Sequence, residues 1–548
     1  MSATSGRPVP PPVPPPVPLP VSPPARPAAS GATATPRGGT LLITGATVLD
    51  GTGAPPRPAD VTVSAGRIAA VVAPGTFAPR DGYATLDATG MMLAPGFIDP
   101  HSHADASPLE REDDTSKILQ GITTEVVGNC GMSPDPRPYG GFGALYEKLD
   151  TAGYVTNYCP LVGHEALHEA AMAGRPGPPD RDDARRMGML LDEAMEAGAF
   201  GLSSGLIYPP GVHTAPGELV GLAARLPEGR LYATHMRDEG RHLRRSVEEA
   251  IELGARTGRR VQVSHLKAAG VPFWGGVDDA LARLDRARAQ GVDIGQDVYP
   301  YDASSTTLLA VMPPWFLEGD DDRVRRRLND PVQVERARAE VEDDTDRGWE
   351  NIVAGDGYDR IMVSSTRSHR HEGATLGELA EALDLAPFEV IVHLLRTEEL
   401  QVHMVDFSMD ERDVETVLRA PRTSVCTDGL AISLGGKPHP RLYGSFPRVL
   451  GRYVRERGVL DLPTAIHKMT GLTAEVFAVP DRGRLAPGLI ADLVAFDRAT
   501  VGDTATYADP RRTPTGIRWV MQAGHVVVRD GRWLGTRRGV RLEPALVP

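Results

Sequence analysis

The middle of the chain alternates short apolar runs with amphipathic stretches. Eight runs have the composition of buried strands, and they are APGFIDP (94–100), ITTEVVGNC (122–130), VTNYCPLVGH (155–164), AFGLSSGL (199–206), RLYATHM (230–236), RRVQVSHLK (259–267), VDIGQDVYP (292–300) and RTSVCTD (422–428). Helical periodicity separates them, as in DARRMGMLLDEAMEAG (183–198) and HLRRSVEEAIELGARTG (242–258). Alternation of strand and helix indicates a parallel sheet, and eight strands predict an α/β protein with a TIM-like (β/α)8 barrel over about 95–478.

Both ends of the chain carry segments of period two, separated by Gly, Pro and Asp. They are TLLITGATVLD, ADVTVSAGRIAAVV and ATLDATGMMLAPGF near the N-terminus, and ADLVAFDRATV and GIRWVMQAGHVVVRDGRWL near the C-terminus. This pattern is typical of a small antiparallel sheet. We predict one β-sandwich built from both termini, with residues 39–94 as its first part and 479–548 as its second.

Two segments interrupt this plan. An insertion at about 303–420 separates the seventh strand from the eighth, and its charged helical and strand-like pieces (RIMVSST, QVHMVDF) predict a partial lid over the barrel mouth. Residues 1–36 contain 13 prolines. Proline fixes φ and has no backbone donor, so residues 1–38 predict a disordered, polyproline-biased tail. An SH3-like partner is the alternative interpretation of this tail.

Composition excludes several classes of function. The 548 residues are 41% hydrophobic and 24% charged, as in a globular protein, and the formal net charge is −13. An acidic chain argues against nucleic acid and anionic membranes as partners. No run of 18 apolar residues or secretory signal pattern is present. Three cysteines give no disulfide framework, which favours a reducing compartment and a cytoplasmic location.

Metal-ligating residue types stand at the carboxyl ends of five predicted strands. They are His101 and His103 after the first strand, Cys130 after the second, His235 after the fifth, His265 after the sixth and Asp428 after the eighth. A barrel directs these ends to one face, where its chemistry takes place. Because alternation sends residues i and i+2 to the same side, the two histidines of PHSH are expected to reach one point.

Each of these residues also has an ordinary structural interpretation. His235 or His265 alone would more often be a hydrogen-bonded core histidine, and Cys130 a small buried hydrophobe. Asp428 could cap a helix. Their coincidence at strand ends favours a metal site instead. Thiolate and imidazole are zinc ligands, and three ligands with one open position are the catalytic arrangement.

The motifs around these residues resemble the amidohydrolase superfamily, and within it the D-aminoacylases (N-acyl-D-amino-acid deacylases). The motifs are PGFIDPHSHAD, GITTEVVGNCGMSP, GLSSGLIYPPG, YATHMRDEG, VSHLKAAG, DVYPYDASST, TDGL, HPRLYGSFPRVLG and GRLAPGLIADLVAFD. The resemblance covers roughly 40–540. Many binuclear relatives use a carboxylated lysine from the fourth strand, but GAFGLSSGL contains no lysine. The resemblance implies that Cys130 takes over its role at the metal.

The resemblance also implies a ligand set. It places one tight zinc on Cys130, His235 and His265, and a second, weaker position beside His101 and His103. Zinc lowers the pKa of bound water and polarises a carbonyl. Asp428 is then expected to take the proton from water and pass it to the leaving amine. By resemblance, Lys267, Tyr299, Ser305 and Arg441 bind the carboxylate and neighbouring groups of the substrate.

The expected activity is hydrolysis of the linear amide of N-acyl-D-amino acids, which gives a carboxylate and a free D-amino acid. One alternative is an amidohydrolase acting on a cyclic amide or a dipeptide, and another is a non-catalytic scaffold of the same fold. The intact ligand set and Asp428 argue against the scaffold. The D-stereochemistry comes from the resemblance alone, and the residues do not indicate a side-chain preference.

Overall fold

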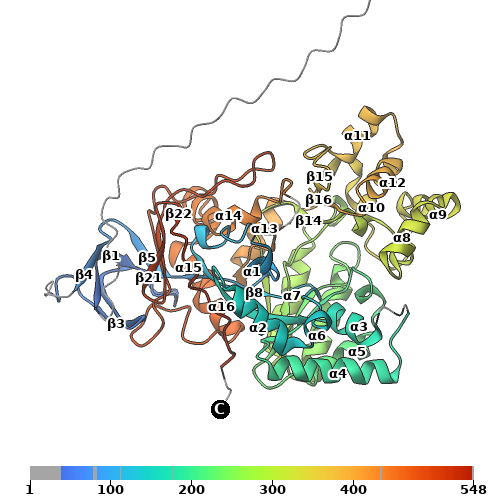
Figure 1. Ribbon diagram of the computed structural model, residues 1–548. Helices are drawn as coiled ribbons and strands as arrows, with labels where there is room; N and C mark the ends of the chain where they lie inside the picture. The colour runs from blue at the N-terminus through green and yellow to red at the C-terminus, as the bar shows by residue number, and fades with distance from the viewer. Residues whose placement is uncertain are drawn as a thin grey trace, which may run out of the picture.

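The computed structural model describes residues 39–77, 83–111, 113–173, 175, 177–431 and 435–545. Figure 1 shows a central barrel with a β-rich unit at one end and a separate helical unit above its mouth. The predicted proline-rich tail and the partner considered for it lie outside the described residues.

The eight predicted central strands are all confirmed. They form one parallel sheet made of β6 (Phe97–Asp99), β8 (Ile122–Val127), β9 (Asn157–Gly163), β10 (Gly201–Gly205), β11 (Leu231–His235), β12 (Arg260–Val263), β13 (Ile294–Val298) and β17 (Thr423–Val425). Neighbours in the sheet follow the order of the chain from β6 to β17. The strands are almost entirely buried, as expected where helices cover a parallel sheet.

The first and last strands of the barrel meet just beyond their carboxyl ends. There β7 (Ser102–His103) pairs in parallel with β18 (Gly429–Leu430). The backbone N–H of Asp428 donates to the carbonyl of His101 at 2.8 Å. The ring is therefore joined at the positions where the sequence predicts chemistry, and residues more than 300 positions apart become neighbours.

Helices surround the barrel. They include α2 (Phe142–Ala152), α3 (His164–Met172), α4 (Arg181–Glu196), α5 (Pro216–Ala223), α6 (Leu243–Thr257), α7 (Val277–Ala289), α13 (Glu411–Arg419), α14 (Arg441–Arg448), α15 (Leu462–Met469) and α16 (Gly471–Val476). Asp180 begins α4 with a capping box, and Gly258 ends α6 in the left-handed conformation. The two helices predicted at 183–198 and 242–258 are confirmed. Each buries an apolar stripe and exposes charge.

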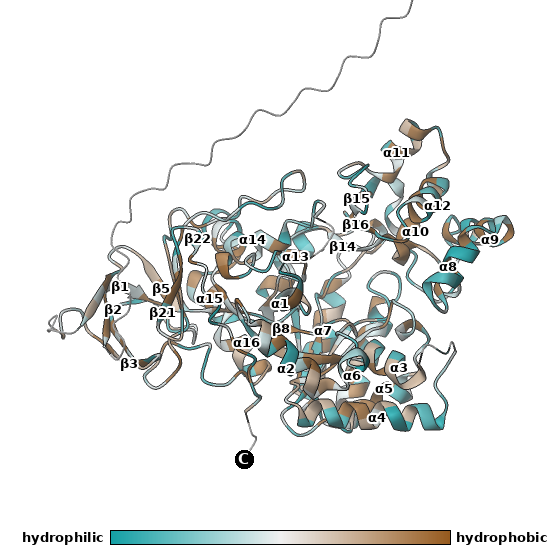
Figure 2. Ribbon diagram, in the orientation of Figure 1, coloured by the Kyte–Doolittle hydropathy of each residue, from teal (hydrophilic) through white to brown (hydrophobic). Residues whose placement is uncertain are grey.

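The insertion folds as a unit with its own core (yellow to gold in Figure 1). Its antiparallel sheet has the order β14 (Ser304–Thr307), β16 (Val402–Asp406), β15 (Ile361–Thr366). Its helices are α8 (Asp321–Leu328), α9 (Pro331–Val341), α10 (Ile352–Asp356), α11 (Leu376–Leu383) and α12 (Pro387–Thr397). Both predicted strand-like pieces are confirmed as strands. Helix α8 is mainly hydrophilic in Figure 2, in keeping with its exposed position.

The two ends of the chain both contribute strands to one nine-stranded sheet. Its strands are β1 (Leu41–Val48), β2 (Arg57–Ser64), β3 (Arg67–Val72), β4 (Ala84–Asp87), β5 (Met92–Pro95), β19 (Leu493–Phe496), β20 (Ile517–Gln522), β21 (His525–Arg529) and β22 (Arg532–Trp533). The expectation of a purely antiparallel sheet is wrong, because β1 runs parallel to both β4 and β5. Strands β1, β2 and β3 pair in antiparallel fashion. After β3 the chain comes back beside β1, and β4 and β5 then run in the same direction as β1.

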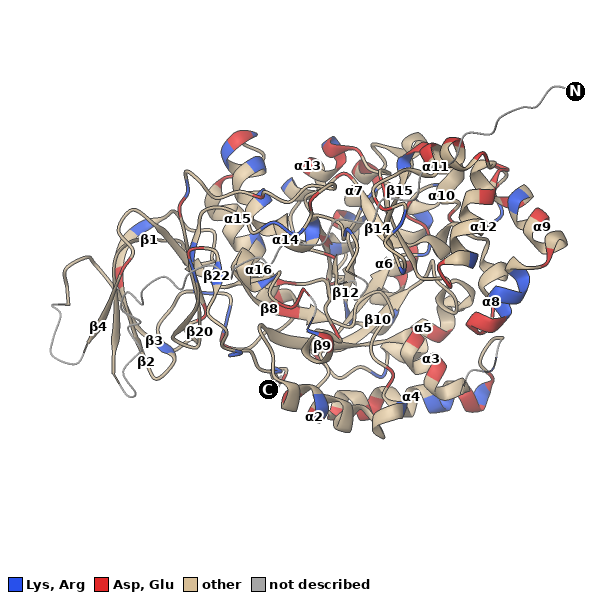
Figure 3. Cartoon of the chain, turned by 45° about the horizontal axis from the view of Figure 1, so that its top comes forward, with Lys and Arg blue, Asp and Glu red and all other residues tan. Residues whose placement is uncertain are grey.

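Charged residues gather on the outer helices, while the barrel strands carry few (Figure 3). This distribution fits a fold whose parallel sheet is enclosed on all sides. Within the described part of the chain, no helix has both the length and the apolar character to cross a membrane.

Candidate metal centre

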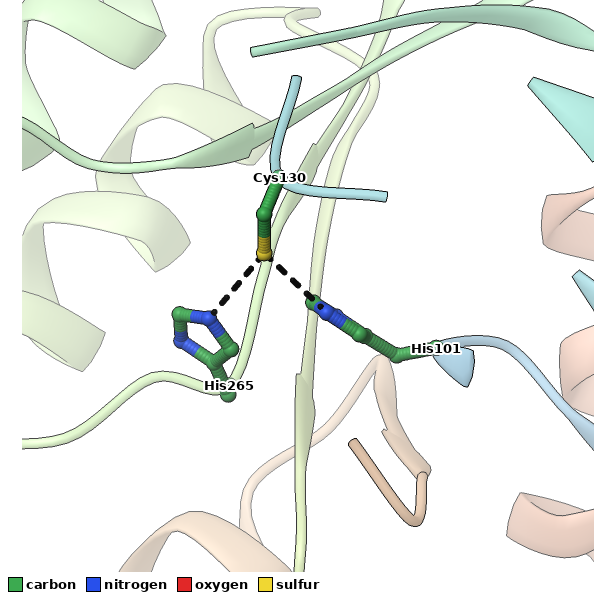
Figure 4. Close-up of side chains that lie close together, drawn as sticks. All are labelled: His101, Cys130 and His265. Atoms are coloured by element: carbon green, nitrogen blue, oxygen red, sulfur yellow. Dashed lines mark hydrogen bonds between the residues drawn. The ribbon is translucent and has the colours of Figure 1, made fainter. Parts of the chain in front are cut away.

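The strand ends bring the predicted ligands to one place. Sγ of Cys130 lies 3.2 Å from Nε2 of His101, 3.6 Å from Nε2 of His265 and 3.9 Å from Nδ1 of His235. Figure 4 shows the sulfur of Cys130 between the rings of His101 and His265. The imidazole of His103 lies beside that of His101, with ring centroids 5.2 Å apart. All five predicted metal-side residues therefore belong to one cluster.

Three residues of this site have an unusual backbone. Cys130, His265 and Asp428 have φ values of +53°, +36° and +47°, in the left-handed region that residues with a side chain rarely adopt. Each stands two or three positions beyond the end of its strand. Such strain is typical of functional sites, where the surrounding structure holds a side chain in position.

The donor atoms form three close groups, in each of which all atoms lie within 4.8 Å of one another. The groups are His101–Cys130–His265, His101–His103–Asp428 and His235–Glu239–His265. The resemblance implies a different set for the tight zinc. That set, Cys130 with His235 and His265, is not one of these three groups. Its members are distributed over two groups that share His265, so the donors form a continuous chain around the barrel mouth.

The residues fit zinc by distance. A tetrahedral zinc with Zn–S of about 2.3 Å and Zn–N of about 2.0–2.1 Å separates sulfur from nitrogen by about 3.6 Å. The three sulfur–nitrogen distances at Cys130 lie between 3.2 and 3.9 Å, on either side of this value. The sulfur–nitrogen distances are therefore close to those that a zinc ion shared by Cys130 and an imidazole would set.

The ionisation of Cys130 fits a metal ligand too. Burial opposes ionisation of the thiol, but the charge of His101 and hydrogen bonds from imidazoles outweigh it. They hold the pKa of Cys130 well below its usual value. The thiolate is the form that binds metal, and the protein stabilises it here.

Two carboxylates that the sequence analysis did not identify orient the imidazoles. Glu239 lies 3.0 Å from Nδ1 of His265 and 3.6 Å from Nε2 of His235. Asp297, on β13, accepts from the backbone N–H of His265 at 2.8 Å and lies 3.4 Å from Nδ1 of His101. Carboxylates behind ligating histidines fix ring orientation. The spacing of Glu239, four residues after His235 in HMRDE, is a signal that could have revealed it.

Asp428 lies at the junction of the histidines and a buried arginine. Its Oδ1 is 3.1 Å from Nε2 of His103 and 3.4 Å from Nε2 of His101, and its Oδ2 is 2.9 Å from Nη1 of Arg441. Burial opposes ionisation, but the positive charge of Arg441 and of the imidazoles holds the pKa of Asp428 well below its usual range. The carboxylate is therefore charged and able to accept a proton.

A buried lysine supports the loop that carries Asp428. Nζ of Lys117 donates to Asp99 at 2.9 Å and to Thr427 Oγ1 at 2.6 Å. The backbone N–H of Thr427 donates to the same Asp99 carboxylate at 2.9 Å. This ion pair under the first and last strands fixes the residue before Asp428. Nothing in the local sequence around Lys117 signals this role, because its partners come from distant strands.

The four predicted substrate residues line one cavity of about 670 Å³ together with Cys130, His235, His265 and Asp428. Three of them are already engaged. Lys267 donates to Glu239 at 2.6 Å, the Tyr299 hydroxyl donates to the sulfur of Met409, and the Ser305 hydroxyl donates to a backbone carbonyl. Arg441 differs, because its buried Nε has no partner, although its Nη1 lies 2.9 Å from Asp428. Arg441 is thus the donor best placed to meet a ligand carboxylate.

Comparison with known proteins gives full-length matches. A family model described as the amidohydrolase family matches residues 84–528. The chain is 34% identical to a D-aminoacylase of Alcaligenes xylosoxydans xylosoxydans, over 91% of this chain and 96% of that one. It is 38% identical to an N-acyl-D-glutamate deacylase of the same organism, over 89% of this chain and 93% of that one.

Solved structures give the same picture. The fold matches an N-acyl-D-glutamate deacylase from Bordetella bronchiseptica, complexed with zinc and a phosphonate inhibitor, with a TM-score of 0.78 and 35% identity over 92% of this chain and 99% of that one. A crystal structure of a D-aminoacylase matches with a TM-score of 0.76 and 34% identity over the same shares. A D-hydantoinase, at 16% identity and a TM-score of 0.55, shares the fold.

Proposed function

Because the chain belongs to the amidohydrolase family, and within it to the D-aminoacylase group, we propose that it is a zinc-dependent hydrolase of N-acyl-D-amino acids. The products are a carboxylate and a free D-amino acid. The observation that carries this proposal is one cavity lined by a thiolate–imidazole cluster, an ionised carboxylate and a buried arginine whose Nε has no partner. The D-stereochemistry rests on the relatives.

Cys130, His235 and His265 would hold the tight zinc, with His101 and His103 at a second, weaker position. The distances from Cys130 and the contacts of Glu239 with both His235 and His265 support this assignment. When bound, zinc polarises the amide carbonyl and lowers the pKa of water.

Asp428 moves the proton. As a carboxylate it accepts a proton from the attacking water, and it then gives this proton to the nitrogen of the leaving amine. His103 and Arg441 hold its two oxygens, which fixes the direction in which the carboxylate faces the cavity. A low pKa suits the first of these steps, because the group must be free of its proton at neutral pH.

Arg441 and Lys267 orient the substrate. The unpartnered Nε of Arg441, next to the Nη1 that pairs with Asp428, suits a ligand carboxylate. Lys267 adds positive charge at the same wall, while the Tyr299 ring and the Ser305 backbone carbonyl hold the guanidinium of Arg441. Gripping the α-carboxylate at one point and the amide at another fixes which face of the α-carbon meets the cavity walls.

The proposed location is the cytoplasm. The three free, buried cysteines support it, because a reducing compartment keeps such thiols unpaired. The net charge of −13 supports a small-molecule substrate rather than nucleic acid.

A substrate screen tests the proposal. Purified protein with zinc is incubated with matched N-acetyl-D- and N-acetyl-L-amino acids, N-acetyl-D-amino acid amides, a hydantoin and a dipeptide, and release of free amine is measured. We expect hydrolysis of the D-amino acid derivatives with a free carboxylate. Preference for the L-series, the cyclic amide or the dipeptide would contradict the proposal.

A further inference from the structure

A second cavity lies between the barrel mouth and the insertion. Its volume is about 530 Å³, and its walls come from the loops after β11 and β12 and from residues 343–356 of the insertion. It shares Ala269, Glu350, Ile352 and Asp406 with the cavity that contains the candidate metal centre. The two spaces are therefore neighbours across a common wall, and we name the second one the acidic cavity.

The acidic cavity is lined by carboxyl groups that do not receive all the hydrogen bonds that they can accept. One oxygen of Asp238 is buried with no hydrogen-bond partner, and Asp356 and Asp406 form a hydrogen bond with each other. Asp238 and Asp406 are 4% and 3% exposed, so water does not compensate them as it would at the surface. A buried carboxyl oxygen without a donor is costly, so Asp238 favours a ligand that supplies a hydrogen-bond donor to this cavity.

The cations of the protein act on this group only from a distance, Arg360 on Asp356 and Lys267 on Glu350. No ion pair joins Asp238, Asp356, Asp406 or Glu350 to a described Lys, Arg or His. The arginines at the rim, Arg241 and Arg347, are paired with the exposed Asp344 and Asp343.

The neighbouring charges are also engaged. Arg360 donates to the carbonyl of Phe407, and Lys267 donates to Glu239. Burial, with the charge of Asp356, raises the pKa of Asp406 well above its usual value. Burial, with the charge of Asp238, does the same for Glu350.

The arrangement suits an organic cation better than a metal ion. These carboxylates do not occur in any described group of three His, Cys, Asp or Glu donors within 4.8 Å of one another. The cavity is also lined by Phe273 and Trp349. Aromatic rings beside carboxylates are a common environment for an ammonium or guanidinium group.

We propose that the acidic cavity binds a cationic end of the substrate, an ammonium or guanidinium group that extends past Ile352 to Asp406 and Glu350. The cation is carried by the side chain of the D-amino acid or by the acyl group. This inference rests on the proposed function, and it gives the enzyme a substrate class, the basic N-acyl amino acids.

The test compares substrates that differ in one charge. The values of kcat/KM are measured for N-acetyl-D-lysine against N-acetyl-D-norleucine, and for N-(5-aminopentanoyl)-D-alanine against N-pentanoyl-D-alanine. A charge-assisted contact predicts a preference of about tenfold or more for the cationic member of one pair. The pair that shows it identifies which side of the amide carries the cation.

Variants then connect the preference to the cavity. Asp406→Asn is nearly isosteric and should reduce the preference at least severalfold, and Glu350→Gln, which keeps an acceptor for the backbone of Glu239, should act in the same direction. Asp321→Asn changes an exposed carboxylate of the same insertion outside both cavities, and it should leave the preference unchanged. Melting temperatures of all three variants show whether each one folds.

Two results overturn the inference. One is equal or better hydrolysis of both neutral substrates, and the other is a cationic preference that persists in Asp406→Asn and Glu350→Gln. If no substrate is hydrolysed, the proposed function fails instead. Calorimetric binding of N-acetyl-D-lysine and N-acetyl-D-norleucine then decides the inference, since equal affinities would reject it.

Discussion

The two ends of the substrate space differ in whether their carboxyl groups are paired with cations. At the barrel end, Asp428 lies 2.9 Å from Arg441, and Glu239 lies 2.6 Å from Lys267. At the insertion end, Asp356 and Asp406 have no ion pair with a described Lys, Arg or His, and they form a hydrogen bond with each other instead.

On our proposals, this difference distinguishes groups that take part in the reaction from groups that bind a part of the substrate. A carboxylate beside a cation keeps its charge when the cavity is empty, as proton transfer by Asp428 requires. A buried carboxyl without a cation holds its proton more tightly, and a positively charged ligand changes that balance. The predictions that follow test the two ends in turn.

The largest effect is expected at the barrel end, from Asp428→Asn. The amide keeps the shape of the side chain but cannot accept a proton. We expect turnover of an N-acetyl-D-amino acid to fall about 10²–10⁴-fold, the usual scale for a general acid–base group. Steady-state kinetics on zinc-loaded protein measure this. Turnover close to that of the unchanged protein would remove Asp428 from the mechanism.

A smaller effect is expected for the cations of the barrel end. Lys267→Met and Arg441→Met remove a charge-assisted contact with the substrate carboxylate, and kcat/KM should fall by about 10–150-fold. Loss of the Arg441 contact with Asp428 slows both substrates alike, so kcat/KM should fall further for the acid than for the matching N-acetyl-D-amino acid amide, which lacks the carboxylate. Equal losses on both substrates would show that these residues do not recognise the carboxylate.

The smallest effect concerns stability at the insertion end. Burial raises the pKa of Asp356 from 3.8 to about 6. An acid with a raised pKa stabilises the folded state fully below its unfolded pKa, and this contribution is lost as the pH rises through about 6. The loss is at most about 3 kcal/mol for a change of two pKa units.

The comparison is between the ligand-free protein and Asp356→Asn, which has no proton to lose at this position. Melting temperatures are measured at pH 4, 5, 6 and 7. The unchanged protein should lose more stability across this range than the variant does. Parallel pH profiles would mean that Asp356 does not release a proton over this pH range in the folded protein.

The barrel end was largely predictable from the sequence. Strand periodicity places residues at strand ends locally, and a barrel collects those ends, so His101, Cys130, His235, His265 and Asp428 could be named without knowing their contacts. What the pattern could not give is the backbone strain at Cys130 and His265, or the choice of partners. Glu239 and Asp297 look like ordinary acids until the fold places them behind the imidazoles.

The insertion end was not predictable. Its carboxylates come from separate loops and strands, and Glu350 meets Glu239 across 111 positions of sequence. The local pattern of hydrophobic and polar residues does not indicate such contacts. The parallel pairing of β1 with β4 and β5 was missed for the same reason, since strand direction in a sheet depends on connections rather than on alternation within a strand.

The most direct test of the account is the metal content of the purified protein and of Cys130→Ala and His265→Ala. Elemental analysis should find about one equivalent of zinc in the unchanged protein, little in either variant and full occupancy in Asp428→Asn. Amine release from an N-acetyl-D-amino acid should follow the zinc content and return when zinc is restored to chelated protein. Full zinc retention in both ligand variants, or undiminished hydrolysis after complete removal of metal, would contradict it.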